Sequence, residues 1–170
     1  MRLTGIAEQV RKTLETAPSS LWSGLVPGKD IPIINAVSPI EVFSREGKAI
    51  YILCDNVEYG LEEPKTGRPS VRCEERLKII TVAVSAKITG HDEDGLDVTN
   101  WETGKILLNL KEEIDEALIR YNWSTHKLRV KVAQTQPAGE SELEMRYFIA
   151  STQFGFIDAC TLESLSTPPS

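Results

Sequence analysis

The chain has 170 residues and a formal net charge of −6, with 41% hydrophobic and 26% charged residues. This composition is that of a globular protein, and the length allows one sizeable core, which excludes wholesale disorder. The acidic balance argues against a protein that mainly grips phosphates, although an acidic wall can let DNA pass without holding it. There is no signal-like or membrane-spanning apolar run, so we expect a soluble intracellular protein without membrane contact.

The cysteine and histidine content gives no indication of a metal centre. The candidate ligands are Cys54, Cys73, Cys160, His91 and His126, which are widely spaced and form no C-x-x-C pair. Zinc sites need close pairs of such ligands, so we predict neither a metal site nor a cofactor.

The first predicted element is an amphipathic helix. Apolar residues recur at three- and four-residue steps at Leu3, Ile6, Val10 and Leu14. Pro18 ends this helix. The following segment, residues 21–39, is rich in proline and glycine but holds several apolar residues, which predicts an ordered connector with a short strand at Ile31–Ala36.

The middle of the chain predicts strands separated by a long loop. Val42-Phe43 and the apolar run Ala49–Cys54 flank a turn at residues 45–48. Residues 56–70 contain two glycines and two prolines among charges, which predicts a long mobile loop. Residues 71–88 alternate as one long strand, with Ile80, Val82, Val84, Ala86 and Ile88 on one face. This strand is longer than average, so part of it should reach beyond the domain body.

The second predicted helix follows an acidic turn at residues 90–97. Thr99 and Glu102 have the spacing of a capping box. The apolar stripe comprises Leu107, Leu110, Ile114, Ala117, Leu118 and Tyr121. Lys111 and Asp115 are one turn apart, and we expect both on the solvent side.

Two final strands are predicted around a turn at residues 136–139. In the first, Leu128, Val130 and Val132 alternate with Lys127, Arg129 and Lys131; in the second, Leu143, Met145, Tyr147 and Ile149 alternate with Glu142, Glu144 and Arg146. We therefore expect basic residues to face acidic ones across a hairpin. The whole pattern predicts one α+β domain over residues 1–162, a mainly antiparallel sheet packed against two amphipathic helices as a two-layer sandwich. Residues 163–170 are predicted to be a flexible tail.

Two motifs have residue types that occur in catalytic or metal-binding sites. Residues 91–97 resemble a calcium loop superficially, but the glycine falls two places early, so a solvated turn is the better interpretation. Asp55 followed by Glu63-Pro64-Lys65 has the residue types of a magnesium-dependent nuclease. Pro64 cannot donate to a strand ladder, and a basic DNA-gripping surface is missing from the sequence. No catalytic motif is defensible, and we expect a protein that is not an enzyme.

The order of the elements resembles that of the tail terminator proteins of tailed bacteriophages. The resemblance covers residues 3–162 and depends most on three segments, RCEERLKIITVAVSAKI (72–88), WETGKILLNLKEEIDEALIRY (101–121) and MRYFIASTQFGF (145–156). It implies a virion protein in the tail or neck that forms a homo-oligomeric ring, commonly of six copies. Such a ring caps the tail tube, joins it to the head through a tail-tube protein and a neck or connector protein, and lets DNA pass without specific binding.

The long loop is the predicted assembly surface of such a ring. Its charged residues Glu62, Glu63, Lys65 and Arg68, with Arg72 at the start of the long strand, are expected to contact a neighbouring copy. Two alternatives stay open. One is another head–tail connector or tail-tube protein, and the other is the magnesium-dependent nuclease.

Overall fold

The computed structural model describes residues 1–37, 47–61, 71–87, 101–142 and 146–163. These residues form two α-helices, α1 (Leu3–Thr16) and α2 (Trp101–Arg120), and two 3-10 turns, η1 (Ser19–Leu21) and η2 (Trp123–His126). They also form five strands, β1 (Ile33–Ala36), β2 (Lys48–Leu61), β3 (Val71–Lys87), β4 (Arg129–Glu142) and β5 (Arg146–Glu163). Both helices, the short strand in the connector and the long strand β3 lie where the sequence predicts them.

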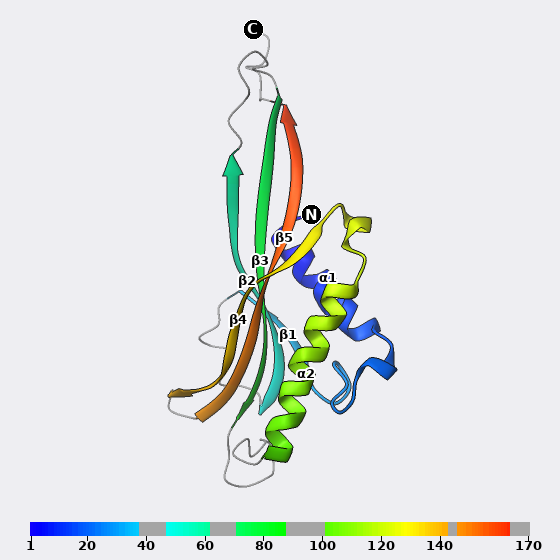
Figure 1. Ribbon diagram of the computed structural model, residues 1–170, viewed down its shortest axis with the longest axis vertical. Helices are drawn as coiled ribbons and strands as arrows, with labels where there is room; N and C mark the ends of the chain where they lie inside the picture. The colour runs from blue at the N-terminus through cyan, green and yellow to red at the C-terminus, as the bar shows by residue number, and fades with distance from the viewer. Residues whose placement is uncertain (38–46, 62–70, 88–100, 143–145, 164–170) are drawn as a thin grey trace.

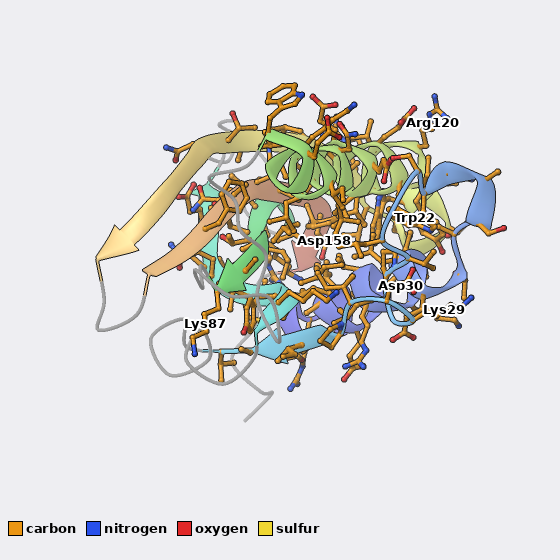
Figure 2. All side chains as sticks on the ribbon, turned by 90° about the horizontal axis from the view of Figure 1, so that it is seen from below. Trp22, Lys29, Asp30, Lys87, Arg120 and Asp158 are labelled. Carbon is orange, nitrogen blue, oxygen red and sulfur yellow. The ribbon has the colours of Figure 1, made fainter. Side chains whose placement is uncertain are left out.

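The strands make one sheet in the order β1-β2-β3-β5-β4. β1 runs parallel to β2, and the other three pairings are antiparallel. Both helices lie on one side of this sheet, as the view along the long axis shows (Figure 2). The predicted class is therefore confirmed: an α+β fold with a mainly antiparallel sheet packed against two amphipathic helices.

The main core lies between the helices and one face of the sheet. α1 contacts β1, β2 and β3, whereas α2 contacts β3, β4 and β5. Even-numbered positions of β2, β3 and β5 supply this face, including Ile50, Ile80 and Phe154, and Leu14 and Ile114 face them from the helices. A smaller cluster of buried residues lies on the opposite face: Ala49, Tyr51, Leu53 and Ala83. The sheet thus buries apolar side chains on both faces.

The predicted loop at residues 56–70 begins too early. β2 continues to Leu61, and its pairing with β3 runs from Lys48↔Ala86 to Leu61↔Glu74. Polar residues and a glycine in this stretch resemble a loop in the sequence, but hydrogen bonding to β3 along one side of the strand keeps them extended. A register shift between Cys54 and Asn56 marks a bulge in β2.

The predicted turn at residues 136–139 is also wrong. These residues lie within β4, where a register shift between Gln136 and Gly139 leaves Pro137 and Ala138 outside the ladder. A proline is tolerated at such a bulge because it needs no ladder donor there. β4 instead continues to Glu142, which pairs with Arg146.

In β5 the even-numbered residues face the helices, and not the alternating set with Ile149 that the sequence predicts. Phe148 and Ala150 belong to the core beneath the helices, whereas Ile149 packs against the smaller cluster on the other face. Arg129 lies opposite Ile157, so basic residues do not face acidic ones there as expected. β5 reaches Glu163. The predicted strand Val42-Phe43, the turn at 90–97, the cap at Thr99 and the rest of the tail lie outside the described residues.

β2, β3 and β5 continue past the ends of both helices (Figure 1). We call residues 58–61, 71–77 and 157–163 the extension. In the extension β3 is the middle strand, paired with β2 on one side and β5 on the other. The length of β3 in the sequence predicts such a projection. We call the rest of the sheet the body.

Candidate assembly surfaces

The predicted assembly residues are only partly within the described structure. Glu62, Glu63, Lys65 and Arg68 lie outside the described residues. Arg72 lies in β3 within the extension, where its backbone pairs with that of Leu162. The loop surface therefore stays a prediction, and the described surfaces that could join another protein are the extension and the two edges of the sheet.

A cluster of charges lies where the extension meets the body. Lys78 is 6% exposed, and its ammonium group lies 3.5 Å from Asp158 Oδ2 and donates a hydrogen bond to the backbone carbonyl of Met1. The amino group of Met1 lies 4.0 Å from the same carboxylate oxygen. These charged groups lie at the end of the apolar core next to the extension. Asp158 and the Met1 carbonyl give the buried Lys78 ammonium the partners it needs, because burying an unpaired charge would be costly.

A second polar cluster lies on the face of the sheet away from the helices. Asp55 Oδ2 accepts hydrogen bonds from Thr81 Oγ1 and Gln153 Nε2, each at 2.9 Å. This carboxylate therefore joins β2, β3 and β5 beside the bulge in β2.

The surroundings of Asp55 bear on the nuclease alternative. Its hydrogen-bond donors are neutral side chains, and the part of the chain that the structure describes contains no group of three or more His, Cys, Asp or Glu residues suited to hold a metal ion. Glu63 and Lys65 lie outside that part. The described residues therefore place no further carboxylate ligands beside Asp55 with which it could hold magnesium.

One segment of each sheet edge carries exposed charges, and the two segments are opposite in sign. β4 is one edge strand, and its exposed side chains include Arg129 and Lys131. β1 covers the opposite edge only beside residues 50–53 of β2, so the following part of β2 has no second strand partner among the described residues. The exposed Asp55 and Glu58 lie on that part. The alternation of basic residues in β4 is visible in the sequence, but its place at the sheet edge depends on the strand order, which the sequence does not show.

A groove of about 560 Å³ separates the ends of the two helices. Its lining includes Thr13, Ala17 and Leu21 on one side and Ala117, Arg120 and Tyr121 on the other. Gln9 Nε2 donates to the Tyr121 hydroxyl at 3.2 Å, and that hydroxyl lies 3.1 Å from His126 Nε2. This network fixes one wall of the groove to α1 and η2.

Asp115 faces the sheet, not the solvent as expected. Its carboxylate accepts a hydrogen bond from the fully buried Thr152 at 3.0 Å and lies 3.4 Å from the Lys111 ammonium. Burial raises the pKa of Asp115, and the Thr152 hydrogen bond and the Lys111 charge oppose that rise without cancelling it. At the bulge in β2, burial likewise raises the pKa of the Cys54 thiol.

Neither family models nor curated proteins provide a match to the chain. Among the described helices, none is both long and apolar enough to cross a membrane. The class that the fold and its surfaces define is thus an α+β domain with a projecting three-strand extension and oppositely charged segments on its two sheet edges.

Proposed function

We propose that the chain is a virion structural protein of a tailed bacteriophage, a tail terminator that forms a closed ring at the end of the tail tube. The observation that carries this proposal is the extension. Three paired strands project past both helices, a length of sheet that the helix-covered core does not require (Figure 1). A projection of this kind has a physical use when a neighbouring copy or a partner protein packs against it.

The edges of the sheet give a second line of support. An exposed edge is a template for pairing with another chain. The two edges differ from each other, and contacts between unlike surfaces generate rings when the rotation closes. The resemblance of the element order to tail terminators supports a place for the ring in the tail, with a tail-tube protein and a neck protein as its proposed partners. The role needs no catalytic group.

The charge of the chain is compatible with a ring around DNA. A net charge of −6 per copy gives an acidic assembly, which repels phosphates and lets DNA slide without specific binding. Within this proposal the protein is made in the host cytoplasm and ends in the virion.

Native mass spectrometry and negative-stain electron microscopy test the proposal directly. The protein is measured from dilute solution up to its solubility limit, with and without magnesium. Closed annular particles with one defined copy number, six being expected, support the ring. A chain that stays monomeric at the solubility limit overturns it, and a twelvefold ring favours a connector. Magnesium-dependent cleavage of DNA in the same samples favours the nuclease.

A further inference from the structure

The opposite charges of the two sheet edges lie at the same height. Following the pairings across the sheet, Arg129 of β4 is aligned through Ile157 and Leu77 with Glu58 of β2. The next row that carries side chains on this face runs from Lys131 to Asn56 through Gly155 and Ile79. Residues in one row of an antiparallel sheet point to the same face. All these positions share the face away from the helices, because the alternate positions Ile80 and Phe154 lie in the core beneath the helices.

The strand directions are compatible with continuing the sheet from one copy to the next. β2, β3, β5 and β4 alternate in direction because each pairing among them is antiparallel. A copy placed beside the β4 edge by rotation about an axis along the strands keeps its own strand directions. Its β2 then runs antiparallel to β4, so the ladder pattern of the sheet continues across the contact.

We propose that neighbouring copies in the ring join edge to edge, with β4 of one copy beside the free part of β2 of the next. The inference rests on the proposed ring and names its contact. A cyclic ring has no rise from copy to copy, so rows at equal height meet when the strands lie along its axis. Glu58 of one copy then lies opposite Arg129 and diagonal to Lys131 of the other, and opposite charges at these cross-strand positions attract.

The same charges disfavour the wrong contacts. Two β4 edges paired through the regular segment Arg129–Val132 would bring basic residues together, and two free β2 edges would bring their Glu58 side chains together, so self-pairing of these segments is repulsive. This leaves the unlike pairing, which is the contact that a ring requires. Bulges in β4 after Val132 and in β2 after Cys54 bend the strands and interrupt the ladder there, as is common at sheet edges.

The contact is short. The regular ladder of β4 before its first bulge covers Arg129–Val132, and β1 occupies the β2 edge beside residues 50–53. A pairing of about four residues on each side is shorter than an average strand and by itself holds two copies only weakly. Closing the ring gives every copy two such contacts at once, which favours complete rings over open dimers.

Charge reversal with rescue tests this contact. We compare Glu58→Lys with the double variant Arg129→Glu/Lys131→Glu, using native mass spectrometry at concentrations where the wild type is a ring. Each variant alone is expected to lose the ring, because both of its contacts in a ring become repulsive. Their equimolar mixture is expected to regain assemblies with even copy numbers in which the two variants alternate, since both kinds of contact are then attractive.

The controls reverse exposed charges on α1, outside the proposed contact. Glu8→Lys and Lys12→Glu change the net charge without touching either edge, and they are expected to keep the ring. Thermal unfolding checks that every variant folds, and Lys131→Glu alone serves if the double variant does not.

The results separate this inference from the proposed function. If the wild type forms no ring, the proposed function fails and the contact with it. If the wild type forms a ring and Glu58→Lys keeps it, the edge contact is wrong and the function stands. Loss of the ring in both variants without recovery in the mixture also overturns the edge contact.

Discussion

β3 passes through two regions of the molecule, and its sequence changes between them. Residues 79–86, within the body, contain no charged side chain, whereas residues 72–78 include Arg72, Glu74, Glu75, Arg76 and Lys78. In the body β3 is buried on both faces, with Val82 beneath the helices and Ala83 in the opposite cluster. β3 pairs with β5 without a register shift through both regions, and its pairing with β2 shifts once, in the body, at the bulge between Cys54 and Asn56.

The comparison separates two sources of order in one strand. Burial stabilises the body, because apolar area removed from water is the main favourable term in folding. The ladder itself keeps the extension regular although neither helix covers it. Regular secondary structure therefore does not mark the limit of the core in this protein, whereas the change from apolar to charged residues at Lys78 does.

The largest expected loss of stability comes from truncating a buried side chain of the core close to Lys78. Phe156 is fully buried and makes an edge-to-face contact with Trp123 at 4.7 Å between ring centroids. Phe156→Ala is expected to lower the free energy of unfolding by about 3–5 kcal/mol. The half-buried Val57, in the same row of the sheet, is the matched control, and Val57→Ala should cost about 1 kcal/mol. Urea unfolding measures both, and equal losses would contradict a core that weakens toward the β2 edge.

The next effect concerns the charges at the boundary. Asp158→Asn removes the carboxylate beside the buried Lys78 ammonium and is expected to cost about 1–3 kcal/mol. The double variant Lys78→Met/Asp158→Asn leaves no buried charge and should recover most of this loss, as replacement of buried ion pairs by apolar groups often does. Guanidinium chloride screens such interactions, so unfolding is followed in urea. A double variant no more stable than Asp158→Asn would show that the pair does not act as a unit.

A smaller effect is expected on replacing Asp115 in the body, as a change in how the unfolding free energy depends on pH. The folded state raises the pKa of this carboxyl above its unfolded value. Folded protein then holds the proton while unfolded protein releases it, so this group lowers the unfolding free energy as pH rises from about 4 through the raised pKa. Asp115→Asn removes that contribution. The stability of the variant relative to wild type should therefore increase over this range, and a constant difference from pH 3 to 7 would contradict a raised pKa.

The smallest effect tests the chemistry at the bulge in β2. Burial raises the pKa of the Cys54 thiol, so less of it is thiolate at neutral pH. Alkylation of the folded protein with iodoacetamide, followed by peptide mass spectrometry, should modify Cys54 more slowly than the same peptide in urea. A folded rate equal to the unfolded rate would contradict this burial.

Periodicity was sufficient to predict the helices and β3, because their apolar residues recur with a clear spacing. It failed where backbone pairing overrides side-chain character. Residues 56–61 are predicted to be a loop because their side chains are mostly polar. Pro137 is predicted to lie in a turn because the sequence does not show that a bulge in β4 accommodates it. The charged edges depend on the strand order. The rows that align Glu58 with Arg129 exist only because β5 lies between β3 and β4, which no local pattern specifies.

That strand order also has a consequence for how the chain acquires its structure during synthesis. β5 is the last described strand in the sequence, yet it lies inside the sheet between β3 and β4. Until residues 146–163 have left the ribosome, β3 has an unpaired side and β4 has no strand to pair with. Val71 cannot pair with Glu163 before that residue is synthesised, and contacts between residues so far apart in the sequence form slowly. The nascent protein therefore holds an open apolar strand, and chaperones that shield such strands should bind it before β5 emerges.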